Sequence, residues 1–192
     1  MKEKDEEIVN SFLDRGIILI SGRITQEHLE IVQKAFVRFY LKQQKKVMVL
    51  ISSYGGDAII GLEIHDLFKL YPGEITGIVV GKAMSAASYI LQGCSIRCAT
   101  FNSRILIHNG RREVDNDILL DDDQLEEYVE NNKKRRERVH RLLAAATKQP
   151  VGIIMGECKR DQEMDVDQAI KFGLLDKIWT EKLPWNPGEE IK

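Results

Sequence analysis

The sequence predicts an α/β fold built on a largely parallel β-sheet. In the first half of the chain, short apolar runs alternate with longer segments whose apolar residues recur at helical spacing. Each of these runs is followed by glycine or serine, residues typical of the turn after a strand. Strands that alternate with helices of this length are typical of βαβ units and of a sheet whose faces are covered.

The predicted elements follow one another through the first eighty residues. Residues 17–20 form a first apolar strand, and residues 25–43 carry apolar side chains at helical spacing. A second strand over residues 47–51 is rich in β-branched residues. A mostly apolar helix over residues 59–70 then leads to a third strand over residues 75–80. These elements make two consecutive strand–helix–strand units.

The third strand leads to a serine with small neighbours. We expect a tight turn over residues 81–84 and a helix that begins at Ser85. A further strand over residues 104–107 ends at His108. Free backbone N–H groups at a helix N-terminus favour negative charge, so a hydroxyl at Ser85 is well placed for chemistry that develops an anion.

The second half is dominated by one long predicted helix, residues 120–147. Its apolar positions cluster at the two ends, whereas residues 130–138 have no apolar face. A segment that is polar on all sides cannot lie on a core, so it is expected to project into solvent or to meet another subunit. Residues 1–7 are expected to form a short arm and residues 182–192 a loose tail of a single domain over residues 1–192.

Composition argues against several classes of protein. The net charge of −2 gives no reason to expect binding to nucleic acid. No apolar stretch approaches the roughly 20 residues of a membrane span, and the first residues lack the apolar region of a signal peptide. Cys94, Cys98 and Cys158 lack metal-ligand spacing and are expected to be buried, reduced thiols. Together these features predict a cytoplasmic protein that binds no membrane.

Ser85 and His108 are the residue types that a serine hydrolase needs as nucleophile and base. Each also has an ordinary structural explanation, a helix N-cap for Ser85 and a structural histidine for His108. The remaining histidines (His28, His65 and His140) lie inside helical patterns and are less well placed.

A diglycine and a later carboxylate complete the candidate site. Gly55-Gly56 stands between a strand and a helix, where it is either a plain turn or a backbone that aims an N–H at a ligand. If the neighbouring strands lie side by side, the Gly56 and Ala86 N–H groups could meet at one oxyanion. Asp161 follows a predicted helix over residues 151–159 and could orient the base. Asp165 and Asp167 compete for that role, although helix capping is the simpler use for either.

Several motifs together resemble a known family. Residues 53–57 (SYGGD), 81–87 (GKAMSAA) and 102–108 (NSRILIH) are similar, in the same order, to motifs of the Clp protease proteolytic subunit family. Further matches are residues 15–22, 160–161 and 169–176. The resemblance covers about residues 8–181 and is specific because the motifs agree in order and approximate spacing.

The resemblance implies a fold, an activity and partners. It implies the ClpP/crotonase-type α/β fold of repeated ββα units, with residues 120–147 as the handle helix. By the same resemblance, Ser85, His108 and Asp161 form the catalytic triad of a serine endopeptidase, and Gly56 and Ala86 supply the oxyanion hole. The family hydrolyses polypeptides within a homo-oligomer of two stacked seven-membered rings, a tetradecamer, served by an AAA+ unfoldase. No metal or cofactor is implied.

The chain departs from the family pattern in four places. The segment before Ile8 is shorter than the family's axial-pore segment, and the separation of 23 residues between Ser85 and His108 (108 − 85) is slightly short. Residues 109–115 lack the glycine-rich strand that pairs rings. Tyr54 replaces the usual proline before the diglycine, and Glu163 stands where an apolar residue is usual. These departures indicate a divergent member.

Two other functions stay open at this stage. A catalytically inactive structural subunit would assemble with an active paralogue, although all three triad residue types are present. A crotonase-type acyl-CoA enzyme would share the fold and would also use backbone N–H groups on a carbonyl, but it would not need Ser85 and His108 as a pair. Labelling of Ser85 by a serine-reactive probe separates both from the peptidase.

Overall fold

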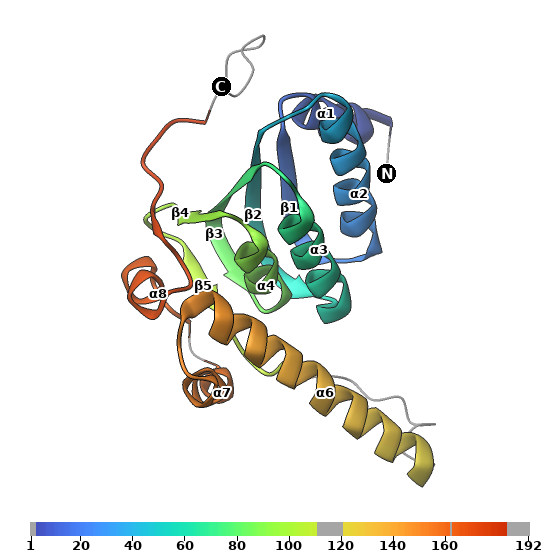
Figure 1. The fold of residues 1–192 in the computed structure, drawn as a ribbon, viewed down its shortest axis with the longest axis vertical. Helices are drawn as coiled ribbons and strands as arrows, with labels where there is room; N and C mark the ends of the chain where they lie inside the picture. The colour runs from blue at the N-terminus through green and yellow to red at the C-terminus, as the bar shows by residue number, and fades with distance from the viewer. Residues whose placement is uncertain (1–2, 111–120, 162, 184–192) are drawn as a thin grey trace.

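The computed structural model describes residues 3–110, 121–161 and 163–183. Parallel strands form its centre (Figure 1). The sheet order is β1 (Ile17–Ile24), β2 (Lys46–Gly56), β3 (Glu74–Met84), β4 (Ile96–Ala99) and β6 (Lys177–Ile178), with β5 (Arg104–Leu106) beside β3. Neighbouring strands pair in parallel, so the predicted α/β class with a parallel sheet is confirmed.

Helices connect these strands and extend beyond them. They are α1 (Glu3–Asp14), α2 (Gln26–Leu41), α3 (Ala58–Leu70), α4 (Ala86–Gly93), α6 (Asp122–Thr147), α7 (Val151–Arg160) and α8 (Val166–Phe172). Helix α1 includes residues 3–7, which were expected to form an arm. Within the tail expected over residues 182–192, Leu183 packs against apolar side chains, and residues 184–192 lie outside the described part of the chain.

The two faces of the sheet carry different cores. Side chains alternate along β1, so that Ile18 and Ile20 pack under α2, α3 and α4 in the main core. Ile17 faces the other way, into a small cluster with Met48, and Phe12 of α1 packs on that cluster. The helices therefore bury one face extensively and leave the other with a thinner cover.

Strand β3 pairs with two different partners along its length. Residues 76–79 pair with β4, and residues 82–84 pair with β5. Between the two halves stands Gly81 at φ +87°, a conformation that glycine adopts without strain. The buried Ser103 hydroxyl accepts a hydrogen bond from Gly81 N (3.1 Å) and donates to Val79 O (2.9 Å). Its bonds satisfy backbone groups at the bend.

Strand β2 bends in the same way. The buried Ser53 hydroxyl donates to Gly22 O (2.6 Å) on β1 and accepts from Gly55 N (3.0 Å). Because a buried serine satisfies the backbone at each bend, both strands continue where the apolar runs end. The predicted strand ends at residues 51 and 80 were therefore wrong, and so was the turn expected over residues 81–84.

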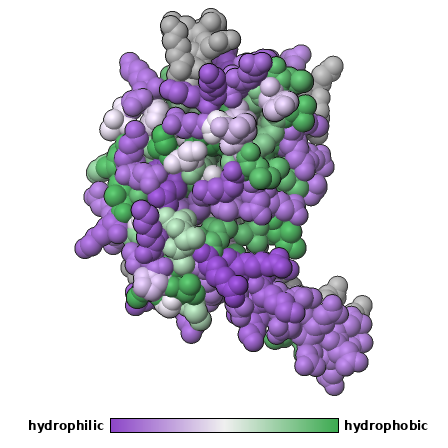
Figure 2. Space-filling model, viewed as in Figure 1, coloured by the Kyte–Doolittle hydropathy of each residue, from purple (hydrophilic) through white to green (hydrophobic). Residues whose placement is uncertain are grey.

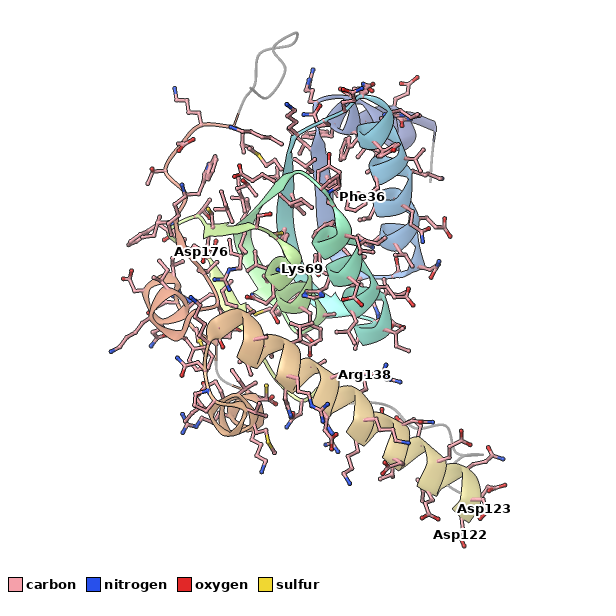
Figure 3. All side chains as sticks on the ribbon, viewed as in Figure 1. Phe36, Lys69, Asp122, Asp123, Arg138 and Asp176 are labelled. Carbon is pink, nitrogen blue, oxygen red and sulfur yellow. The ribbon has the colours of Figure 1, made fainter. Side chains whose placement is uncertain are left out.

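Helix α6 is anchored at one end only. Val139, His140, Leu143 and Thr147 are buried, whereas the N-terminal half projects away from the body (Figure 1) and is covered by hydrophilic residues (Figure 2). Its first residues, labelled in Figure 3, lie at the tip furthest from the sheet. The observed bounds follow the predicted helix closely. Its N-terminal half projects, as predicted, whereas Asn132 and Arg135 in its polar middle are partly buried.

Arg97 ties the anchored end of α6 to the sheet. From β4, its guanidinium donates to Ala146 O (3.3 Å) on α6, to Gly173 O (2.8 Å) after α8 and to the carboxylate of Asp176 (Figure 3). Burial alone would raise the pKa of Asp176, but the hydrogen bonds from Arg97 lower it below its ordinary value. One charged side chain thus holds three segments together.

Replacing Ser103 tests the bend in β3. Ser103→Ala removes a buried hydroxyl that bonds both Gly81 N and Val79 O, so we expect a loss of about 1–3 kcal/mol in the free energy of unfolding. Urea denaturation at a fixed protein concentration measures it. Ser21→Ala is the matched control, because Ser21 is exposed on β1, and should change stability by less than about 0.5 kcal/mol. Equal effects of the two variants would contradict the structural role of Ser103.

Candidate active site

Ser85 stands alone at the sharp turn between β3 and α4. Its backbone adopts φ +54° and ψ −124°, a rare conformation for a residue with a side chain. Ser85 N donates to Leu106 O (2.9 Å), and Ser85 O accepts from Ser88 N (2.9 Å). Helix α4 begins directly after Ser85, so the prediction of a helix at this point is confirmed.

Ser85 is partly accessible to solvent. Residues 83, 84 and 86–94 are all buried, and Ser85 is the partly exposed residue among them. Although Ser85 occupies the N-cap position of α4, its side chain makes no capping hydrogen bond. The simpler interpretation as a helix cap therefore does not account for this hydroxyl.

The diglycine at the end of β2 lies against this turn. Gly55 has φ +95°, and a Cβ placed there would lie 2.7 Å from both Met84 O and Ser85 Cβ, and 3.2 Å from Ala86 N. Only a residue without a side chain allows this close approach. The backbone of Gly55-Gly56 therefore runs beside Ser85 and the first N–H groups of α4, as the parallel pairing of β2 with β3 requires.

His108 reaches the same edge from β5. Ile107 is fully buried before it, and the His108 ring is mostly buried. Tyr89 OH donates to His108 O at 3.5 Å. Because residues 82–84 pair with β5, the carboxyl ends of both strands meet at this edge. His108 is therefore two residues beyond the Leu106 carbonyl that accepts from Ser85 N.

Asp161 meets the His108 ring from the end of α7. Asp161 Oδ1 lies 3.3 Å from His108 Nδ1. Asp161 follows the last residue of α7 in the left-handed conformation (φ +50°), which aspartate tolerates better than most residues. A carboxylate at this distance favours a proton on Nδ1, which leaves the Nε2 lone pair available as a base.

Backbone hydrogen bonds hold α7 and the chain after it against β5. Asn109 N donates to Cys158 O (3.0 Å), and Ile105 exchanges two hydrogen bonds with Met164 (3.0 and 2.8 Å). These links flank Asp161 on both sides in sequence. The approach of its carboxylate to His108 is therefore fixed by the main chain.

The other candidate carboxylates have a different use. Asp165 caps α8, since its side chain accepts from Gln168 N at 2.9 Å, and Asp167 lies in the first turn of that helix. Within the described residues, the carboxylate that contacts His108 belongs to Asp161. Capping was the simpler expectation for this pair, and it is confirmed for Asp165.

Ser85 is bonded to β5 two residues before His108, but Ser85 and His108 are not hydrogen-bonded to each other in the described structure. Over the described part of the chain, the Ser85 hydroxyl makes no hydrogen bond to the His108 ring. The backbone contact between Ser85 and Leu106 keeps the two residues near each other. Catalytic hydrogen bonds are often long or misaligned before substrate binds, and rotation of side chains can close such a gap.

The arrangement of Ser85, His108 and Asp161 can be compared with known proteins. A family profile described as Clp protease matches residues 1–182. The chain belongs to the Clp protease family. A variant of ClpP1 from Listeria monocytogenes has a similar solved structure, with a TM-score of 0.80 and 25% sequence identity over 91% of this chain and 97% of that one. The Clp protease family is one of serine peptidases, and the predicted ClpP-type fold is confirmed.

The remaining histidines of this Clp protease family member have structural partners. His28 Nε2 lies 2.8 Å from Ser21 O, and His65 Nδ1 lies 2.8 Å from Asp66 Oδ1. His140, on α6, donates from Nε2 to Asn109 Oδ1 at 2.9 Å. Burial, reinforced by Arg136, lowers the pKa of His140, so its ring is neutral at neutral pH.

The contact between His140 and Asn109 adds residues that sequence reasoning missed. It joins the handle helix to the residue that follows His108. The sequence carried one weak signal for it, a histidine beside Val139 where the apolar spacing of the long helix resumes. Only the tertiary structure shows that this histidine faces the site.

The cysteines of the chain are buried. Burial raises the pKa of Cys158 to about 12, assisted by Glu157 and Asp161, and burial also raises the pKa values of Cys94 and Cys98. All three cysteines are buried and free, as predicted. Among the described residues there is no cluster of three metal-ligating side chains, and none of the helices is long and apolar enough to cross a membrane.

Proposed function

We propose that this chain is a serine endopeptidase that hydrolyses peptide bonds through an acyl-enzyme. Ser85 attacks the peptide carbonyl, His108 accepts its proton at Nε2, and Asp161 orients the ring and stabilises its charged form. The observation that carries the proposal is the distance of 3.3 Å between His108 Nδ1 and Asp161 Oδ1. The partly exposed Ser85, whose side chain does not cap α4, lies at the same edge of the sheet. A structural histidine would not need that serine at its edge of the sheet.

The Gly56 and Ala86 N–H groups are proposed as the oxyanion hole. Ala86 is the first residue of α4, where N–H groups have no partner inside the helix. The close approach of Gly55 to Ser85 and to Ala86 N supports a shared target for the two backbones. Donors aimed at the developing oxyanion are among the largest contributions to acyl-transfer catalysis.

The proposed cycle begins with closure of the gap between Ser85 and His108. Their backbones are already linked through Leu106, so we propose that side-chain rotation forms the hydrogen bond when substrate binds. His108 then protonates the leaving amine, and a water molecule attacks the acyl-enzyme with His108 again as base. Each step needs the proton on Nδ1 that Asp161 favours.

Two alternatives are weaker. An inactive structural subunit does not require the main-chain links that hold Asp161 against His108. A crotonase-type acyl-CoA enzyme could use the same backbone N–H groups, but it gives no role to the strained, partly exposed Ser85. The contact between His108 and Asp161, and the partly exposed Ser85 at the same edge of the sheet, favour the peptidase.

We further propose a homo-oligomer of heptameric rings, stacked as a tetradecamer, that degrades polypeptides delivered by an AAA+ unfoldase. The projecting half of α6 is the feature that a neighbouring ring would cover. Residues 111–120, which include part of the segment lacking the family's glycine-rich strand, lie outside the described residues. Three buried, unpaired thiols support a reducing, cytoplasmic location.

A serine-reactive probe tests the function directly. We expect a fluorophosphonate to label Ser85 of the assembled protein, because the oxyanion hole and base activate that hydroxyl. Mass spectrometry of the labelled peptide identifies the site, and Ser85→Ala should abolish labelling. Ser21→Ala, which removes another exposed hydroxyl, should leave it unchanged. A properly assembled protein that stays unlabelled would favour the structural subunit.

Asp161 is tested by a substitution that keeps its shape. Asp161→Asn should lower kcat by about 10²–10⁴-fold, because an amide neither favours the proton on Nδ1 nor stabilises the charged ring. Peptide hydrolysis measures it, and circular dichroism checks that the fold is retained. Asp165→Asn is the control, since asparagine also caps helices well. A small effect of Asp161→Asn would remove Asp161 from the triad.

Sedimentation velocity tests the proposed assembly. The purified chain should sediment as a tetradecamer, about fourteen times the 22.0 kDa mass of one chain. Truncating the projecting end of α6 should yield single heptamers while each subunit keeps its fold. A wild-type monomer or single heptamer at micromolar concentration is incompatible with stacked rings.

A further inference from the structure

A separate pocket of about 280 Å³ opens beside His108. Its lining includes Ala58, Tyr89 and His108 on the body of the protein. Ala58 stands two residues after Gly56, and Tyr89 lies one helical turn after Ser85 on α4. The pocket is therefore lined by the base and by residues that follow the diglycine and Ser85 closely in sequence.

The opposite wall of the pocket is the inward face of α6. Tyr128, Asn132, Arg135 and Val139 recur at helical spacing, line the pocket, and are buried or partly buried while most of their neighbours on the helix are exposed. The polar middle of α6, which looked in sequence like a face for solvent or another subunit, thus also forms part of this pocket.

The described lining of the pocket carries positive charge. Arg135 and Arg136 line it, and the described lining residues include no aspartate or glutamate. On the same helix Lys134 and Arg141 pair with Glu130 and Glu137, whereas neither lining arginine pairs with a carboxylate in the described structure.

Apolar and neutral groups complete the pocket. Ala58, Tyr89 and Val139 offer contacts for methylene groups. His140, whose ring donates to Asn109, is buried, so the cationic charge is carried by the arginines. A cavity with apolar walls and a guanidinium that pairs with no carboxylate of the described residues suits a side chain that has a short aliphatic stem and a carboxylate end.

We propose that this pocket selects substrates with glutamate or aspartate on the acyl side of the scissile bond, and that Arg135 determines this specificity. The inference rests on the proposed peptidase function, since it assigns a substrate class to the same site. Arg135 contributes more than Arg136 because it is partly buried on the inward face, whereas Arg136 is exposed at the rim. The guanidinium pairs with the substrate carboxylate and takes no part in bond cleavage.

The test compares peptides that differ at one residue. Four fluorogenic peptides of the same sequence carry glutamate, glutamine, leucine or lysine before the scissile bond. We expect kcat/KM for the glutamate peptide to exceed that for the glutamine peptide about tenfold, as one charge-assisted contact allows. The preference should shrink as salt rises, because the pocket is open to solvent.

Variants of α6 assign the preference to one side chain. Arg135→Gln should make the glutamate and glutamine peptides equal, while Arg135→Lys keeps the charge and should retain part of the preference. Lys133→Gln is the matched control, because it also removes one positive charge from the helix. Lys133 is exposed and does not line the pocket. Equal sedimentation of Arg135→Gln and Lys133→Gln excludes an effect through assembly.

The two hypotheses fail in different ways. If the peptides are cleaved but glutamate has no advantage, or if leucine is preferred and Arg135→Gln changes nothing, the specificity inference is wrong and the peptidase stands. If no peptide is cleaved and Ser85 is unlabelled, the peptidase is wrong. In that event, binding of the same peptides to the Ser85→Ala variant, measured by fluorescence anisotropy, still tests the specificity of the pocket. Equal affinities for the glutamate and glutamine peptides would overturn the specificity inference.

Discussion

The bend of β3 at Gly81 is the constraint on which the site depends. One strand pairs first with β4 and then with β5, and the Ser103 hydroxyl satisfies the backbone where the partners change. Because β5 takes over at residues 82–84, its end lies beside the turn at Ser85. A sheet in which β3 stopped at residue 80 would leave the serine and the histidine on separate segments with no shared edge.

The same strand carries the rest of the site. Ile105 is paired with Met164, and Asn109 is bound by the end of α7, so the chain around Asp161 is attached on both sides of His108. Asn109 also accepts from His140, which connects the anchored part of α6 to this edge. The base, its carboxylate and the pocket wall therefore share one support, and a displacement of β5 would move all three.

The sequence predicted the parallel α/β class because apolar runs alternate with segments of helical spacing. It predicted the helix after Ser85 because small residues follow that serine directly. It did not predict that β2 and β3 continue through glycine, because Ser53 and Ser103 supply their hydrogen bonds from distant positions. The choice among Asp161, Asp165 and Asp167 also needed tertiary contacts. The role of His140 was not predicted for the same reason. A helical pattern indicates that a residue is buried, but it does not identify the residue that it contacts, here Asn109.

The backbone conformation of Ser85 lowers the stability of the fold at the position where the proposed chemistry needs a hydroxyl. A residue with a side chain at φ +54° is less stable there than glycine by about 1 kcal/mol or more. A glycine at this position would relax the turn and strengthen the subunit, while taking away the hydroxyl that the turn displays. Selection for stability alone would thus replace this serine by glycine. A Clp-like subunit with a purely structural role would not be expected to retain it.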